Sequence, residues 1–446
     1  MEVLIYFAVR LYCICSPALA EVQAYLLSSS NSKMLKLSVV LLLTVYSIAC
    51  TAHGENTKET DPPKPQHAKL YPITVDGKHG FIDESGNVKF MLPEEVYTIF
   101  AFSEGLAVAG KRVPNTNGRW GFIDETGKYV IEAKFIMVKR FSEGLAAVVF
   151  KENENAYSKV GYIDQTGHMV IPPRFSGEGG VSERGFSEGL AAVKVNKDRV
   201  DKWGYIDKSG KLVIEPQFAA AGPFSEGRAM VGIAEPSWSI NYKWGFIDTE
   251  GRWVTKPQYE SASEFSEGLA PVLMNDRVGF IDLQGRIAIQ PQFAPDGSGG
   301  CVLDGRVGAS RFSEGLAAVQ LKTGVWGKEW GFIDRRGNWV IRPEFACAAP
   351  FSEGLAVVGV RDEQGHWLYG YIDKTGATVI KPQFSEAGSF VGKLALVTIG
   401  MTQEEVLTKG LEAGKPEAEI EKELEKFKQK YAYIHRTGKV VWQTPD

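Results

Sequence analysis

The chain has little of what metal-binding and many catalytic sites need. Its 446 residues include only 6 histidines and 5 cysteines. The histidines form no i, i+4 pair and no H-E-x-x-H motif, and no two cysteines form a C-x-x-C pair. We therefore expect no metal site and no cofactor. The formal net charge is −4 and no lysine- or arginine-rich block stands out, so we also expect no nucleic-acid partner.

Cysteine is too scarce for a disulfide framework. Cys13, Cys15 and Cys50 fall in the N-terminal segment, and only Cys301 and Cys347 fall in the body of the chain. The last two could form one bridge, but two buried free thiols are the interpretation we favour.

Long apolar runs are confined to the first 50 residues. The stretch from Leu35 to Cys50 begins just after Met34, carries Lys36 near its start and ends in small residues before the cysteine. It resembles a bacterial lipoprotein signal and is short for a membrane span. We expect residues 1–50 to be a targeting segment, with Met34 as the true start and Cys50 as the lipidated residue. The protein is then exported to the cell envelope, where it is either anchored to the membrane, which it touches only through its lipid anchor, or periplasmic or extracellular.

Residues 51–68 are polar and proline-rich, which predicts a linker. Beyond them the chain is dominated by two alternating motifs with a step of about 40 residues. The motif G-[FY]-I-D begins at Gly80, Gly121, Gly161, Gly204, Gly245, Gly279, Gly331 and Gly370. The motif F-S-E-G-[LR]-A begins at Phe102, Phe141, Phe186, Phe224, Phe265, Phe312 and Phe351, with a degraded copy at Phe390.

The residues of one unit predict β-structure. In residues 120–124, Trp120 and Phe122 face one side of a strand and Ile123 the other. The sequence from Asp124 to Gly127 predicts a turn, in which the aspartate caps backbone amides. A second strand follows, and in most units a proline such as Pro216 is expected to limit it. The segment 190–195 predicts a third strand, so each unit is a three-stranded antiparallel meander.

The repeat is similar to the WG-repeat family, named for the pair present at Trp120-Gly121, Trp203-Gly204, Trp244-Gly245 and Trp330-Gly331. The resemblance covers roughly residues 70–400 and 431–446. It implies a β-rich repeat fold in a bacterial protein, here a lipoprotein. It implies no biochemical activity and no catalytic residues.

The predicted fold is all-β, with a tandem array of about eight 40-residue meanders over residues 69–400. We favour an elongated, solenoid-like array because both terminal units are worn, as capping units are. A closed β-propeller is the alternative. Residues 431–446 are expected to form a terminal half-repeat cap.

Residues 401–430 break the repeat and predict a short helical insert. Thr402 to Glu405 form a capping box, Gly414 is a stop, and a second helix begins near Pro416. That helix places three apolar residues on one face, namely Ile420, Leu424 and Phe427. We interpret the insert as a lid on the final repeat, with a docking surface for a partner as the alternative.

Three patterns suggest chemistry, and each has a structural explanation. Residues 185–189 fit the nucleophile motif G-x-S-x-G, but F-S-E-G recurs in almost every unit, so a serine hydrolase is rejected. The repeated aspartates and glutamates are equal members of a series, whereas catalysis needs one special pair. The repeated tryptophans are expected to pack between units, while the irregular Trp238, Trp326 and Trp367 are candidates for ligand contact.

The sequence therefore predicts no enzyme. The leading hypothesis is an envelope-associated scaffold that binds an unknown protein or a cell-wall glycan through its β surface. The alternative is a purely structural surface or spacer protein, and the distant alternative is a glycan-acting enzyme.

Overall fold

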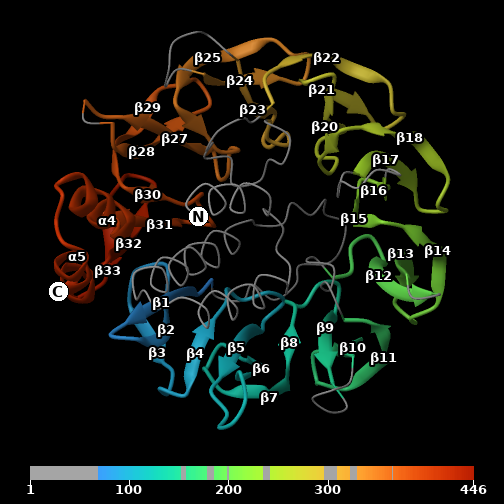
Figure 1. Ribbon diagram of the computed structural model, residues 1–446, viewed down its shortest axis with the longest axis horizontal. Helices are drawn as coiled ribbons and strands as arrows, with labels where there is room; N and C mark the ends of the chain where they lie inside the picture. Colours follow the sequence, from blue (N-terminus) through green and yellow to red (C-terminus); the bar gives the residue numbers. More distant parts are fainter. Residues whose placement is uncertain are drawn as a thin grey trace.

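The computed structural model describes residues 69–151, 157–177, 185–197, 200–234, 242–295, 309–321, 329–363 and 365–445. These residues form nine small antiparallel sheets, which are set around a common centre as the blades of a β-propeller (Figure 1). Within each blade the strands pair in sequence order, and the last strand lies at the periphery (Figure 1). Two short helices accompany the described sheets.

The first five blades follow one another along the chain. Blade 1 contains β1 (Tyr71–Val75), β2 (Lys78–Ile82) and β3 (Val88–Met91). Blade 2 contains β4 (Val96–Ile99), β5 (Ala107–Lys111), β6 (Arg119–Ile123) and β7 (Tyr129–Phe135). Blade 3 contains β8 (Met137–Val138), β9 (Leu145–Phe150), β10 (Lys159–Asp164) and β11 (Met169–Ser176). Blade 4 contains β12 (Leu190–Lys197), β13 (Val200–Asp207) and β14 (Leu212–Phe218). Blade 5 contains β15 (Ala220–Ser225), β16 (Arg228–Ala234), β17 (Tyr242–Asp248) and β18 (Trp253–Tyr259).

The last four blades complete the ring. Blade 6 contains β19 (Ser261–Ala262), β20 (Leu269–Met274), β21 (Arg277–Asp282) and β22 (Ile287–Phe293). Blade 7 contains β23 (Leu316–Gln320), β24 (Trp330–Asp334) and β25 (Trp339–Phe345). Blade 8 contains β26 (Cys347–Ala348), β27 (Leu355–Arg361), β28 (Trp367–Asp373) and β29 (Thr378–Phe384). Blade 9 contains β30 (Glu386–Ala387), β31 (Leu394–Ile399), β32 (Lys430–His435) and β33 (Val440–Gln443), with α4 (Gln403–Glu412) and α5 (Glu417–Lys426) between β31 and β32.

The expected solenoid is wrong, and the closed propeller, kept as the alternative, is the fold. Blade 1 packs against blade 9 in a buried cluster that joins Tyr71, Ile73 and Ile82 to Leu394 and Tyr433. An elongated array would leave these two terminal units far apart. The expected unit also needs correction, because six of the nine described sheets have four strands. The extra strand is the short one that precedes each F-S-E-G motif.

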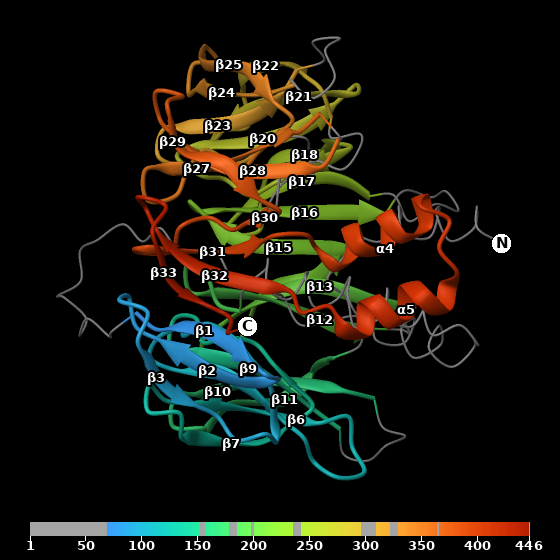
Figure 2. The same cartoon turned by 90° about the vertical axis from the view of Figure 1, so that its left-hand side faces the viewer.

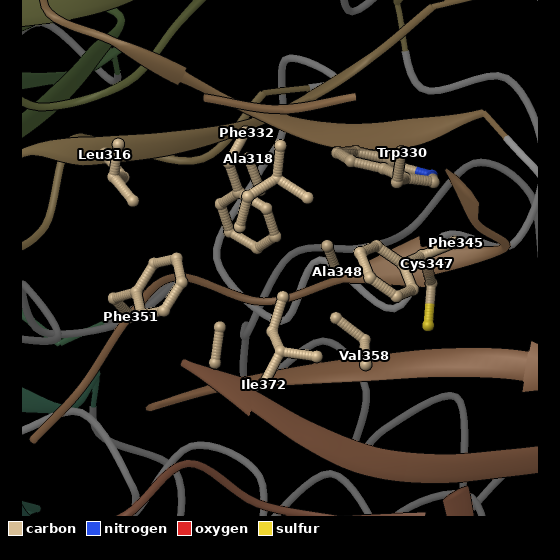
Figure 3. Packing of buried hydrophobic residues seen from close by; sticks show 12 residues of the cluster. Leu316, Ala318, Trp330, Phe332, Phe345, Cys347, Ala348, Phe351, Val358 and Ile372 are labelled. Atoms are coloured by element: carbon tan, nitrogen blue, oxygen red, sulfur yellow. The ribbon is translucent and has the colours of Figure 1, made fainter. Parts of the chain in front are cut away.

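The hydrophobic core lies between the blades. Phe122 of blade 2 belongs to a cluster with Phe141 of blade 3, whereas its neighbour Ile123 belongs to a cluster with blade 1. This confirms that successive side chains of the G-[FY]-I-D strand face opposite sides. The ring centroids of Phe122 and Phe141 lie 4.7 Å apart, and the equivalent pair of blades 7 and 8, Phe332 and Phe351, is seen in Figure 3.

The proline of each unit does not limit its strand. β14 continues past Pro216 to Phe218, and the pairing with β13 absorbs the proline as a bulge. Trp203 pairs with Phe218 and Tyr205 with Ile214, so four steps on β14 oppose two on β13. The bulged backbone lies directly on the intervening Gly204, since a Cβ there would come within 2.5 Å of the Ile214 carbonyl oxygen. The W-G and P-x-F motifs are thus the two sides of one contact.

Antiparallel pairing sends alternate connections to opposite faces of the ring. One face, the turn face, carries the F-S-E-G turns and the D-x-x-G turns. The other, the loop face, carries the connections between the second and third strands of a full blade. These connections range from two residues between Met274 and Arg277 to the helical hairpin between Ile399 and Lys430. Figure 2 shows α4 and α5 beyond the ends of β31 and β32.

The helical insert follows its sequence pattern closely. Thr402 caps α4 and forms the predicted capping box with Glu405, and Gly414 has a φ of 65° just after the helix. Ile420 and Leu424 are buried, whereas Phe427 lies just past the end of α5 and is half-buried. Ile420 packs against Gly410 of α4, where a Cβ would come within 2.8 Å of it.

Two other features bear on the sequence expectations. Cys347 is disulfide-bonded, so the expectation of two free thiols is wrong for this residue; Cys301 lies outside the described residues. Among the residues that the structure describes, no helix has the length and apolar character needed to cross a membrane.

Candidate functional site

The F-S-E-G motif forms a tight turn at the inner edge of the turn face, which we call the inner turn. In blade 3 the backbone of Ser142 and that of Leu145 exchange both N–H···O bonds across the turn. The residues between them, Glu143 and Gly144, have φ values of 54° and 85°. Two consecutive left-handed residues define a type I′ hairpin turn. Glutamate is an unusual choice for a left-handed position, so its side chain must have a compensating role.

That role is a hydrogen bond to the next blade. The carboxylate of Glu188 in blade 4 accepts from the backbone N–H of Glu226 and of Gly227 in blade 5, at 2.6 and 2.7 Å. The carboxylate is held between blades by the amides that the next left-handed turn exposes. The same acceptor role is filled at the other inner turns by Glu104, Glu143, Glu226, Glu267, Glu314 and Glu353.

The serine of each inner turn makes a second inter-blade bond. Its hydroxyl donates to the carbonyl oxygen of the F-S-E-G phenylalanine in the following blade, at distances between 2.6 and 2.8 Å. The donors are Ser103, Ser142, Ser187, Ser225, Ser266, Ser313 and Ser352. Ser187, the serine of the apparent nucleophile motif, thus has the same structural partner as its equivalents. The sequence marked this serine as repeated but gave no indication of its partner.

The aspartate of each G-[FY]-I-D motif caps the turn that follows it, which we call the outer turn. One carboxylate oxygen of Asp164 accepts from the Thr166 hydroxyl at 2.6 Å and from the amides of Thr166 and His168. The Thr166 hydroxyl, aided by these amides, lowers the pKa of Asp164 below its usual range. The predicted capping role is confirmed, and the bond from the amide two residues on recurs at Asp83, Asp124, Asp207, Asp248, Asp282, Asp334 and Asp373.

Blade 9 departs from the pattern, and its neighbour, blade 1, carries no F-S-E-G motif. Val391 and Gly392 occupy the serine and glutamate positions, so the hydroxyl and the carboxylate are both absent there. Tyr71 of β1 replaces them. Its hydroxyl donates to the Val391 carbonyl oxygen at 2.9 Å and accepts from the Lys393 amide, while Tyr433 donates to the Pro72 carbonyl oxygen at 2.8 Å. These three bonds join the two ends of the chain.

The repeated tryptophans lie in the clusters between blades, as predicted. Trp330 is 1% exposed in the cluster between blades 7 and 8 (Figure 3). Trp120, Trp203 and Trp244 are half-buried at the edges of the equivalent clusters. Burial of an aromatic ring here stabilises the contact between consecutive blades.

The structure describes only one of the single residues that the sequence analysis named as candidate site residues. Cys50, Trp238 and Trp326 lie outside the described residues. Trp367 is half-buried on β28, with the Arg361 guanidinium 4.0 Å from its ring centroid and the Tyr369 ring stacked 6.0 Å away. The Arg361 guanidinium thus lies over one face of the ring on which a ligand could stack, and the contact role of Trp367 stays a prediction.

No concentrated chemical centre emerges from the described ranges. Within them, no group of three or more histidine, cysteine, aspartate or glutamate side chains is placed to hold a metal ion. The inner-turn serines and glutamates instead form a series of hydrogen bonds between consecutive blades on the turn face. The arrangement defines a repeat-built, nine-bladed β-propeller.

Comparison with known proteins identifies the repeat. The family described as "WG containing repeat" matches seven segments, residues 120–153, 161–197, 203–233, 244–277, 279–294, 330–362 and 369–400. Over these segments the ring is therefore built from WG-containing repeats, which confirms the resemblance noted in the sequence. No curated protein matches the chain.

Solved structures share the fold. One, titled "Crystal structure of the eukaryotic initiation factor", covers 84% of this chain and 96% of its own, with a TM-score of 0.54 and 11% sequence identity. At this identity the likeness concerns the fold alone.

Proposed function

We propose that this protein is a structural scaffold of the cell envelope, in which a rigid ring spaces or shields its surroundings and no catalysis takes place. The observation that supports this proposal is the fate of the repeated polar groups. The serine and glutamate of the inner turn bind the next blade, and the aspartate of the outer turn caps its own turn. The repeated serines, glutamates and aspartates, which suggested catalytic or metal-binding groups in the sequence, therefore stabilise the ring.

The proposed location follows from the sequence. We propose export through the segment that ends at Cys50, lipidation of Cys50, and a linker over residues 51–68 that carries the ring away from the membrane. Metabolic labelling with a palmitate analogue tests the anchor. Label should appear in the wild-type protein and be lost in Cys50→Ala.

A second function, binding of a protein or a glycan, is favoured by one specific observation. The inner turns are nearly uniform, whereas the loop face varies from a two-residue connection to the α4–α5 hairpin. Variation on one face of a rigid scaffold is typical of a recognition surface. Leu411 of α4 is 55% exposed there.

Photo-crosslinking in the native envelope separates the two functions. A photoreactive residue in place of Leu411 samples the loop face, and one in place of Val213, which is 44% exposed on the outer strand β14, is the matched control. A structural scaffold gives no discrete product from either position. A discrete product from position 411 alone would replace the structural role with binding, and turnover of a cell-wall glycan by the purified ring would contradict both.

A further inference from the structure

Three interfaces between consecutive blades share one polar contact on the turn face. At each of them the inner turn of one blade supplies a glutamate, and the outer turn of the next blade supplies a cation or an amide donor. Lys208 of blade 4 lies 3.0 Å from Glu143 of blade 3, and Lys374 of blade 8 lies 2.9 Å from Glu314 of blade 7. Gln165 of blade 3 donates in the same way to the backbone of Glu104.

The interface between blade 9 and blade 1, which we call the seam, has these charges exchanged. Here the inner turn supplies the cation, Lys393, and the outer turn supplies the carboxylate, Glu84. The Lys393 ammonium and the Glu84 carboxylate are 2.6 Å apart. Lys69, just before β1, adds a further cation 3.9 Å from Glu353.

The backbone of the blade 9 turn is adapted to this exchange. Gly392 has a φ of 65°, while Lys393 is not in the left-handed region. This pattern, with glycine at the first central position, is typical of a type II′ turn instead of type I′. A Cβ at position 392 would come within 2.7 Å of the Lys69 side chain and 3.0 Å of the Tyr71 hydroxyl, so a larger residue there would displace the Lys69 side chain.

We propose that Glu84 and Lys393 are a recognition pair through which the two ends of the chain identify each other and close the ring. At the seam the pair is attractive. Blade 9 would meet like charge if it faced the outer turn of an internal blade that carries lysine, and blade 1 would meet like charge if it faced an ordinary inner turn.

The seam needs such a pair more than the other interfaces do. Blades that follow one another in sequence are held together by a short connection, so their contact forms at high effective concentration. In the part of the chain that the structure describes, blades 9 and 1 share no strand and are joined by their mutual packing and side-chain bonds. The Lys393 side chain is exposed and that of Glu84 is half-buried, so solvent screens the pair and limits its strength, which suits a role in selection.

Thiol accessibility at the seam tests the proposal. Ile73→Cys places a reporter in the buried seam cluster, Leu394→Cys is a second reporter on the blade 9 side, and Val231→Cys reports on the blade 4–blade 5 interface. Maleimide labelling is followed by peptide mass spectrometry in four backgrounds: unchanged, K393E, E84K, and E84K/K393E. K374E, which breaks an internal pair, is the matched control.

The proposal predicts that K393E or E84K speeds labelling of both seam reporters by about three- to tenfold, as expected for an exposed pair made repulsive. The double variant should return the rate to within about twofold of the unchanged protein. Labelling at position 231 should not respond, and K374E should leave the seam unaffected. Equal labelling in all backgrounds, failure of the double variant to restore protection, or the same seam response to K374E would overturn the proposal.

Discussion

Ser142 of blade 3 donates its hydroxyl hydrogen to the carbonyl oxygen of Phe186 in blade 4, across an Oγ–O distance of 2.6 Å. Phe186 is fully buried, so its carbonyl oxygen has little access to water if the donor is removed. We expect Ser142→Ala to lower the free energy of unfolding by about 1 kcal/mol. Urea unfolding followed by tryptophan fluorescence measures it. Thr378→Ala, on the exposed side of β29, is the control, and an equal effect of the two substitutions would argue against the inter-blade bond.

At the left-handed glutamates, backbone strain lowers the stability of the ring and the hydrogen bonds to the next blade raise it. At Glu188, with a φ of 54°, asparagine fits the backbone better but its side chain is too short to reach the blade 5 amides. We expect Glu188→Asn to destabilise the ring by about 1–2 kcal/mol, because two charge-assisted bonds outweigh the relief of backbone strain.

The control for this prediction is a left-handed residue on the loop face. Asp276 has a φ of 55° in the short connection of blade 6, and Asp276→Asn should leave the urea midpoint unchanged or raise it slightly. A rise in the midpoint for Glu188→Asn would show that turn geometry, and not the bond between blades, decides stability at the inner turn.

The local structure could be predicted from the sequence because its causes are local. Asp124 caps a turn within four residues of itself, and the alternation of Phe122 and Ile123 is set by the pleat of one strand. The role of Pro216 was not predictable in the same way. A proline after a β-branched pair usually ends a strand, and only the close approach of the bulge to Gly204 shows why this strand continues.

The sequence analysis favoured an open array over a closed ring because blades 9 and 1 are complementary at their contact and differ there in sequence. The last G-[FY]-I-D copy has lost its glycine and aspartate, at Ala432 and His435, and this loss favoured a worn capping unit. Blade 9 has also lost the inner-turn serine and glutamate. In the structure the loss of the serine and the glutamate is matched by a blade 1 that carries no F-S-E-G motif, and Tyr71 contacts both Val391 and Lys393. Tyr71 and Val391 are more than 300 positions apart in the sequence. A repeat pattern aligns equivalent positions of similar units, so it does not indicate a contact between two positions that are not equivalent.

Tyr71 makes the seam sensitive to alkaline pH. Burial, aided by the nearby carboxylates, raises the pKa of Tyr71 to about 12 from an ordinary value of 10. Because the pKa is higher in the folded state, the neutral hydroxyl contributes its full stability below pH 10. That contribution, on the order of 2 kcal/mol, is lost as the pH rises from 10 to 12.

Thermal unfolding between pH 9 and 12 tests this dependence. Tyr71→Phe should lower the unfolding temperature at pH 9 and reduce the further decline above pH 10, since one of the titrating groups is gone. Other tyrosines, such as Tyr129 and Tyr431 with pKa values of about 12, keep part of the decline. Tyr157→Phe, at a residue that is 77% exposed, should reproduce the wild-type curve. An unchanged slope in Tyr71→Phe would exclude this hydroxyl as a source of the alkaline loss.

Two glycines of blade 4 separate the two reasons for which a glycine is required. Gly189, in the inner turn, has a φ of 80° and open space where a Cβ would project. Gly204, in the W-G pair, is not left-handed, but a Cβ there would lie 2.5 Å from the Ile214 carbonyl oxygen and 2.9 Å from the Pro216 nitrogen. Both of those atoms belong to backbone that a side-chain rotation cannot move.

We therefore expect Gly189→Ala to cost about 1–2 kcal/mol, the price of a left-handed alanine. Gly204→Ala should cost about 3 kcal/mol or more, because β13 and β14 must separate at the bulge. Urea midpoints of the two variants give the comparison directly, since both lie in one blade and add the same methyl group. A milder effect at Gly204 than at Gly189 would mean that the bulge yields easily. The close packing of the bulged strand would then not explain why glycine recurs in the W-G pair.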